Sequence, residues 1–392
     1  MASSPLSRTT AVESAMDAKA AGIPWPTWCA ALAVTSAVVG AHWDISWHRS
    51  IGRDTFWTPA HMAIYLCGVL AGISSAYLIL DTTFNKRAAM AENSVRIWGF
   101  RGPLGAFIAA WGGIAMLTSA PFDNWWHDAY GLDVKIVSPP HVVLFLGAFG
   151  VSVGALILAL AQRNRSSGAS TMRFEWLFLY VGALIVILLQ TLLLEFTAHP
   201  SLHTTLPYRM EAIFIPFVLA GIARVSSHRF SATILTGLYS IFLIGTILIL
   251  PLFPAQPKLG PVYRPVTHFI PNQFPILLIV PAFLLDVFWH CFANWNKWLL
   301  AAGSAVLFTG ALLVAEWPFA SFLQSPAARN AFFGAGYLDY ATPPNSSDAR
   351  YVFDIVDTGA LFWMNIAAAT AFAFVSTRLG FSWGEWMRKV KR

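Results

Sequence analysis

Aspartate and histidine recur at fixed spacing in a polar stretch between two apolar runs. This stretch, residues 42–61, reads HWDISWHRSIGRDTFWTPAH. Asp44 and His48 are four residues apart, so on a helix their side chains share one face. His61 follows Pro59, a favourable first helical residue, and therefore falls in the first turn of the next helix. One carboxylate and two imidazoles aimed at one place form a ligand set for copper, iron or zinc.

A second stretch, residues 122–141, repeats this pattern in the sequence FDNWWHDAYGLDVKIVSPPH. Asp123 and His127 again lie four residues apart, and His141 again follows proline in the pattern P-x-H. Each stretch closes one apolar run and opens the next, so both copies have the same orientation, as in a parallel repeat. The sequence predicts one three-ligand metal site per copy. The alternative is that Asp–His hydrogen bonds merely tie each hairpin together.

Two further pairs of residues correspond between the copies. Asp54 and Asp133 are expected either to accept the free ring N–H of a ligand histidine or to form turns beside glycine. Thr58 and Ser138 precede the prolines and are predicted N-caps of the second helix of each hairpin.

Composition sets the class of protein. The chain has 392 residues, a mean hydropathy of +0.59 and only 11% charged residues, whereas soluble domains carry about 25%. Runs of roughly 20 apolar residues cross a bilayer as helices. The sequence therefore predicts an all-α, polytopic transmembrane helix bundle with an internally duplicated two-helix hairpin. We expect about ten spans, near residues 25–43, 59–81, 103–121, 140–162, 174–195, 210–226, 230–251, 273–292, 298–317 and 358–378.

The chain divides into five regions by composition. Between a tail and a basic C-terminus lie the duplicated hairpins, further helices and a long polar loop. The expected boundaries are 1–23 for a disordered tail, 24–165 for the metal-binding hairpins, 166–317 for further helices, 318–357 for an outer loop, and 358–392 for the last span and basic tail. The three cysteines lie in or beside apolar runs without a CxxC motif, so neither a disulfide framework nor a zinc knuckle is expected.

Most of the 25 Lys and Arg residues fall in the N-terminal tail, the even-numbered loops and the C-terminus. By the positive-inside rule both termini are cytoplasmic, and both hairpin turns face the periplasm of a bacterial-type inner membrane. Basic residues dispersed in short loops do not indicate a nucleic-acid partner, whereas membrane lipid is an expected one.

Weaker signals for a secondary or supporting site lie in the second half. Glu195 and His199 are four residues apart at the end of the fifth predicted span, with His203 beyond Pro200. His268 lies in a Pro-interrupted outer loop. A third metal site and simple capping or interface roles are both compatible with these residues.

The two ligand spacings, Asp-x3-His-x12-His and Asp-x3-His-x13-His, resemble the metal motifs of the C subunit of copper membrane monooxygenases, the particulate methane and ammonia monooxygenase family. The resemblance covers roughly residues 40–145 and implies copper bound by Asp44, His48 and His61. It implies a second nearby site at Asp123, His127 and His141, where the family has Asn in place of Asp123. The family subunit has about six or seven spans, against ten expected here.

Two classes of function follow. The first is a copper-dependent, monooxygenase-like oxidoreductase acting on a small apolar or lipidic substrate at the outer face, with zinc or iron as alternative metals and other membrane subunits as partners. Open coordination positions would allow the metal to activate oxygen or water. The second is a copper or zinc binding or transport protein. A structural accessory subunit is a third reading.

Overall fold

A computed structural model describes residues 23–85, 93–131, 137–198, 201–258, 266–333 and 356–391. Helices dominate these ranges, with one small antiparallel pair of strands. The elements are α2 (Trp25–Ser50), α3 (Pro59–Phe84), β1 (Val95–Ile97), β2 (Phe100–Gly102), α5 (Leu104–Tyr130), α6 (Pro139–Arg163), α7 (Ala169–Leu193), α8 (Leu206–Val225), α9 (Ser231–Ile249), η2 (Leu250–Leu252), α10 (Ile279–Cys291), α11 (Lys297–Leu323), η3 (Pro326–Ala328) and α13 (Gly359–Met387).

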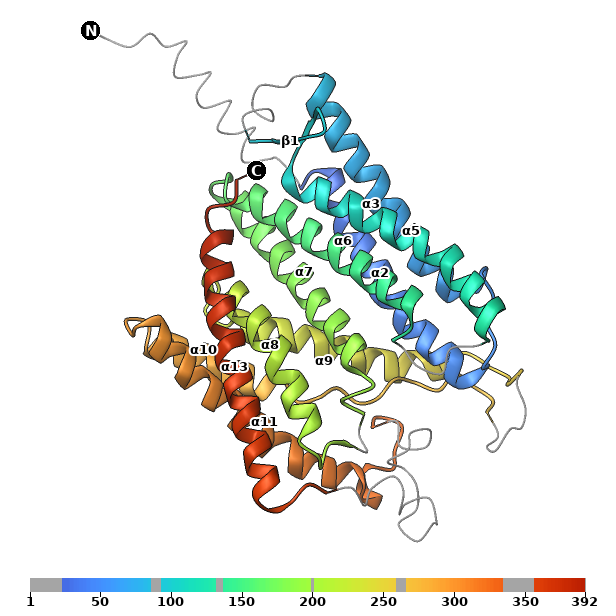
Figure 1. Ribbon diagram of the computed structural model, residues 1–392, viewed down its shortest axis with the longest axis vertical. Helices are drawn as coiled ribbons and strands as arrows, with labels where there is room; N and C mark the ends of the chain where they lie inside the picture. The colour runs from blue at the N-terminus through green and yellow to red at the C-terminus, as the bar shows by residue number, and fades with distance from the viewer. Residues whose placement is uncertain are drawn as a thin grey trace.

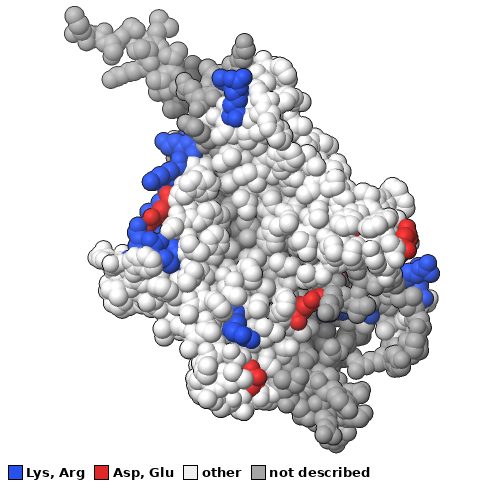
Figure 2. Space-filling model, in the orientation of Figure 1, with Lys and Arg blue, Asp and Glu red and all other residues white. Residues whose placement is uncertain are grey.

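Within the described ranges, nine helices are long and apolar enough to cross a bilayer. Figure 2 shows a broad uncharged face over these helices, with the charged side chains gathered toward its margins. The predicted all-α polytopic bundle is confirmed, and the chain is an integral membrane protein whose outer surface contacts lipid.

The span predicted near 273–292 is shorter than expected. Its helix, α10, has 13 residues, which at 1.5 Å per residue is about 20 Å, well below a bilayer core of about 30 Å. Pro271 and Pro275 lack a backbone N–H and disfavour the helical conformation of the residue before them, so the chain enters the helix only at Ile279.

Two other helices extend past prolines at which the prediction ended them. α5 continues through Pro121 to Tyr130, and α11 continues through Pro318 to Leu323. The continuation of α5 keeps Asp123 on a helix. Most of the predicted outer loop, residues 334–355, and nearly all of the predicted N-terminal tail lie outside the described residues.

The bundle has two groups of helices on either side of α7. The hairpins α2–α3 and α5–α6 form one group, and α8, α9, α10, α11 and α13 form the other (Figure 1). Of the nine long apolar helices in the described ranges, α7 is the most enclosed, with 83% of its most apolar 18-residue stretch buried. We call the end of the bundle that carries the α2–α3 and α5–α6 turns the hairpin end. The C-termini of α6, α8 and α13 lie at the opposite end.

Glycines bring α5 and α6 into close contact. A Cβ on Gly112 would lie 2.5 Å from the Val151 nitrogen, and one on Gly154 would lie 2.6 Å from the Ala109 nitrogen. Neither site has room for a side chain, so the backbones pack directly, as is common between membrane helices. This packing fixes the α5–α6 hairpin as a rigid support for its turn.

Candidate metal centre

The first candidate centre joins the two helices of the α2–α3 hairpin. Asp44 and His48 lie in the last two turns of α2, Asp54 in the turn, and His61 in the first turn of α3. One ligand atom from each of these residues lies within 4.8 Å of those of the other three. We call these four residues cluster 1.

In cluster 1 the Nε2 atoms of both histidines face both carboxylates. His61 Nε2 lies 3.2 Å from Asp44 Oδ1 and 3.2 Å from Asp54 Oδ2. His48 Nε2 lies 3.6 Å from Asp44 Oδ2 and 3.4 Å from Asp54 Oδ2. Ligand atoms that share one ion at about 2.1 Å are about 3.0–3.4 Å apart. The spacing fits one small transition-metal ion, and it also fits direct Asp–His hydrogen bonds.

The other ring nitrogen of His61 is held by the turn itself. Nδ1 lies 2.9 Å from the carbonyl oxygen of Thr55, which accepts its N–H and leaves Nε2 for the cluster. The Thr55 N–H in turn donates to Thr58 Oγ1 over 2.8 Å, and the Trp47 indole donates to the Arg53 carbonyl over 2.9 Å. Thr58 therefore orders this turn, whereas its predicted N-cap bond to α3 is absent.

Asp54 occupies a different position from the one expected. It approaches the same Nε2 atoms as Asp44 and does not bind a Nδ1–H group, so it is a fourth candidate ligand. Burial disfavours its charged form, but hydrogen bonds from His48 and His61 and their positive charge outweigh this effect and hold the pKa of Asp54 well below its usual range. Asp54 is therefore an anion at neutral pH.

Asp44 carries the buried acceptor atom that a cation would best satisfy. Its Oδ1 atom is buried and accepts no hydrogen bond of good geometry, although His61 Nε2 lies 3.2 Å away. A buried carboxylate oxygen without such a bond is costly, and a metal ion between Oδ1 and Nε2 would satisfy both atoms. The residues of cluster 1 therefore fit a bound metal.

The second hairpin repeats this arrangement with fewer described ligands. Asp123 Oδ2 lies 3.4 Å from His127 Nε2, and its Oδ1 lies 3.5 Å from His141 Nε2. His127 Nδ1 lies 3.2 Å from the Gly131 carbonyl, which parallels the bond between His61 and the first turn. Ser138 Oγ accepts the His141 N–H over 3.4 Å, the N-cap bond expected from the sequence. We call Asp123, His127 and His141 cluster 2; Asp133 lies outside the described residues.

A cavity of about 30 Å³ separates the two clusters. Asp44 and His61 line it from cluster 1, and Asp123 and His141 line it from cluster 2. Tyr65, one turn beyond His61, also lines the cavity, with its ring 6.0 Å from that of His61. The structure thus brings both clusters to one small polar space at the hairpin end, large enough for one or two molecules the size of water.

The secondary candidates lie apart from this space. His203 contacts Ser321 Oγ at 3.0 Å and packs against Trp317, so it joins the α7–α8 turn to α11. His268 is exposed, with Nδ1 2.9 Å from Thr267 Oγ1. Glu195 follows α7 and belongs to neither cluster, and His199 lies outside the described residues.

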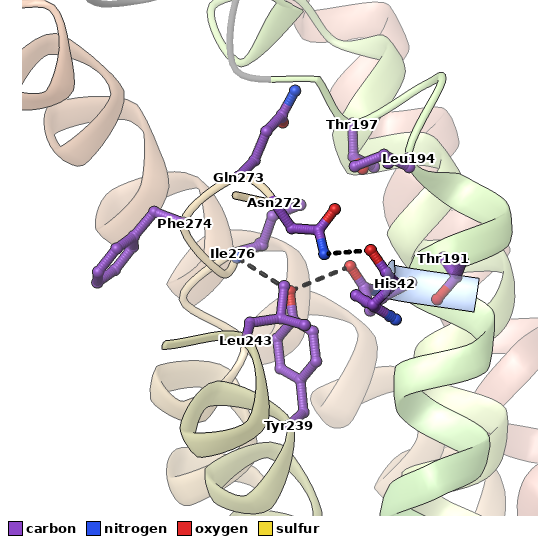
Figure 3. A pocket seen from close by; sticks show the side chains of 11 residues that line it. His42, Thr191, Leu194, Thr197, Tyr239, Leu243, Asn272, Gln273, Phe274 and Ile276 are labelled. Carbon is purple, nitrogen blue, oxygen red and sulfur yellow. Dashed lines mark hydrogen bonds between the residues drawn. The ribbon is translucent and has the colours of Figure 1, made fainter. Parts of the chain in front are cut away.

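An extended segment, residues 266–278, supports the end of α2 in a way that sequence reasoning missed. Ser46 Oγ donates to the Ile270 carbonyl over 2.6 Å, and the Ile270 N–H donates to Ser50 Oγ over 2.7 Å. Asn272 donates to the His42 carbonyl over 3.2 Å (Figure 3). Ser46 and Ser50 are four residues apart on the face of α2 opposite the predicted ligands, so the sequence did indicate a polar contact there. It did not indicate which segment makes that contact.

A second cavity lies behind α2. Its volume is about 630 Å³, and apolar side chains of α2, α9 and the following turn form most of its wall, with His42 and Trp43 at one side. This volume suits a small organic molecule. His42 lies two residues before Asp44, about 200° around the helix, so the cavity and cluster 1 lie on different faces of α2.

No protein-family model, no curated protein and no solved structure matches the chain. The spacing and geometry of the two clusters therefore remain the basis for assigning a function.

Proposed function

We propose that this chain is a membrane metalloprotein in which cluster 1 binds one copper ion and which acts as a copper-dependent, monooxygenase-like oxidoreductase. The observation that carries the proposal is the convergence of four ligand atoms within 4.8 Å of one another. Imidazole and carboxylate together suit copper, iron and zinc, and the resemblance to the copper membrane monooxygenases favours copper.

Asp44, Asp54, His48 and His61 would hold the ion, and copper there would supply one-electron and oxygen chemistry. The turn carbonyl of Thr55 orients His61 for this role. His48 is the most exposed ligand, with 38% of its side chain accessible, whereas Asp54 is 6% exposed. His48 therefore lies on the open side of the site.

Two spaces fit the reactants of such an enzyme. The cavity between the clusters accommodates a molecule as small as oxygen or water, beside Asp44 and His61. The larger apolar cavity behind α2 has the size and lining for a small apolar or lipidic molecule. An electron donor and further membrane subunits would complete the reaction, and the positive-inside rule puts the hairpin end on the periplasmic side.

Metal analysis of the purified protein tests this proposal. The protein is stripped with a chelator in detergent, reloaded with Cu²⁺ or Zn²⁺, desalted and assayed by mass spectrometry of its metals and by electron paramagnetic resonance. We expect copper to be retained, with a type 2 spectrum split by nitrogen ligands. Failure to retain any metal would reduce cluster 1 to Asp–His hydrogen bonds and refute the proposal.

Metal transport is the second candidate, because two carboxylates are buried in the interior, one on α8 facing α7 and one on α11. Glu211 accepts from Gln190 Nε2 over 2.7 Å, and Glu316 accepts from the Leu277 N–H over 2.8 Å; each retains one buried oxygen without a hydrogen bond. Such groups mark ion pathways in membrane proteins. Copper uptake into proteoliposomes that is lost in Glu211→Gln would favour transport over catalysis.

A further inference from the structure

A polar cavity of about 370 Å³ lies at the opposite end of the bundle, far from both clusters. The C-terminal ends of α8, α10 and α13 and the N-terminal ends of α9 and α11 surround it. Its polar lining includes Arg224, Ser226, His228, Arg229, His290 and Arg388. We call this space the basic cavity.

The arginines of the basic cavity form no direct ion pair with a carboxylate among the described residues. None of Arg224, Arg229 and Arg388 forms an ion pair there, and Arg224 Nε is buried without a hydrogen bond. The Arg224 guanidinium instead lies 4.5 Å from the centre of the Phe381 ring. Another nitrogen without a hydrogen bond, His228 Nε2, is also buried at this lining.

The nearby acids are already engaged. Asp286 Oδ2 accepts the Thr233 N–H over 2.8 Å and the Thr233 hydroxyl over 2.7 Å, so it caps the start of α9. Glu385 forms an ion pair with Lys297 and attracts Arg224 only at longer range. The lining of the cavity therefore contains three guanidinium groups and one carboxylate, Asp286, which is already hydrogen-bonded to Thr233. The cavity has an excess of positive charge.

Aromatic side chains place the basic cavity at the level of lipid headgroups. Trp289 and Phe381 line it, while Phe292, Trp295 and Trp298 beside it are 37%, 46% and 56% exposed. Exposed Trp at the end of membrane helices is typical of the boundary between hydrocarbon and water. Figure 2 shows basic and acidic side chains gathered on the margin of the molecule at this level, next to the uncharged face.

We propose that the basic cavity binds the phosphate group of an anionic phospholipid, with Arg224 and Arg229 as its main ligands. Guanidinium groups pair with phosphate oxygens through charge-assisted hydrogen bonds. Basic pockets between membrane helices on the cytoplasmic side are suited to such headgroups. Free phosphate has the same chemistry, but the adjoining exposed aromatic residues favour a ligand that also carries acyl chains.

Lipid titration of the purified, delipidated full-length protein tests the proposal. In neutral detergent, binding of phosphatidylglycerol with a fluorescent acyl label is compared with binding of phosphatidylcholine carrying the same label, and a large excess of inorganic phosphate is the third arm. The variants are Arg224→Gln, Arg229→Gln, their double variant and Arg224→Lys. Arg173→Gln is the matched control, since Arg173 is exposed at the same end on α7 and lies outside the cavity.

We expect phosphatidylglycerol to bind more tightly than phosphatidylcholine, with a loss of about fivefold for each arginine replaced by Gln and roughly 25-fold for the double variant. Arg224→Lys should keep most of the affinity, and Arg173→Gln nearly all of it. Equal binding of the two lipids, or wild-type affinity in the double variant, would overturn the proposal. Binding of inorganic phosphate with full displacement of the lipid would assign the cavity to a soluble anion and overturn the lipid assignment. Arg229 lies in the exposed turn between α8 and α9, so Arg229→Gln keeps the test valid if Arg224 variants misfold.

Discussion

Replacing Asp54 by Asn tests whether cluster 1 has three ligands or four. The substitution preserves the shape of the side chain but removes one negative charge from a position 3.2 Å from His61 Nε2 and 3.4 Å from His48 Nε2. An amide oxygen is a much weaker copper ligand than a carboxylate. If Asp54 binds the ion directly, as the structure indicates, metal affinity should fall by at least the 10–100-fold that the loss of a supporting partner costs.

The size of the effect on stability follows from this loss. A metal present at 100 times its dissociation constant stabilises the wild-type protein by about 2.7 kcal/mol. At the same metal concentration, a tenfold weaker variant would gain about 1.4 kcal/mol and a 100-fold weaker one about 0.4 kcal/mol. Between about 1.3 and 2.3 kcal/mol of metal-dependent stabilisation should therefore disappear.

Copper affinity is measured by equilibrium dialysis in detergent, and stability by thermal unfolding with and without copper. Asp128→Asn is the matched control, because Asp128 is exposed near the hairpin end and belongs to neither cluster. Asp44→Asn should behave like Asp54→Asn. If Asp54→Asn retains wild-type copper affinity while Asp44→Asn loses it, Asp54 only accepts hydrogen bonds from the histidines and does not bind the ion. That result would refute the four-ligand centre.

Four further results are expected. His61→Ala should weaken copper binding in the same dialysis assay by at least 10–100-fold, whereas the exposed His268 should tolerate Ala; equal losses would contradict the assignment of the ligands. Gly131→Ala should lower the free energy of unfolding by about 1–3 kcal/mol in denaturant, because its φ of 90° and ψ of −175° are accessible essentially only to glycine; Gly72→Ala, with open space at its Cβ, should be neutral or stabilising, and no difference between the two would refute the strain argument. Because the pKa of Asp54 is lowered, the metal-free wild type should exceed Asp54→Asn in thermal stability above pH about 4 and lose this advantage as the pH falls further; an advantage that grows on acidification would contradict it. In a background without Cys291, Arg53→Cys should react with an impermeant reagent on intact cells, and Arg165→Cys only after permeabilisation; the reverse labelling would turn the hairpin end to the cytoplasm.

The local chemistry of this chain could be predicted from its sequence because it depends on neighbouring residues. Apolar runs of bilayer length determine the helices, since a backbone in lipid must satisfy its own hydrogen bonds. The i,i+4 spacing aligns Asp44 with His48 on one face, and Pro59 starts the helix that carries His61. Pro121 and Pro318 misled the prediction because surrounding helices stabilise a continued helix in spite of a missing hydrogen bond.

Only the tertiary structure decided which carboxylates share an ion and what holds them in place. The path of the turn brings Asp54 to the Nε2 side of both histidines. That path depends on hydrogen bonds such as the one between Thr55 and His61, which a periodic sequence pattern does not predict. The remaining contacts join residues that are far apart in the sequence. Ile270 binds Ser46 and Ser50, which are more than two hundred residues away. The basic cavity is formed by residues from five helix ends. Such contacts arise from how helices pack side by side, and a linear pattern specifies which face of a helix is buried but not which partner covers it.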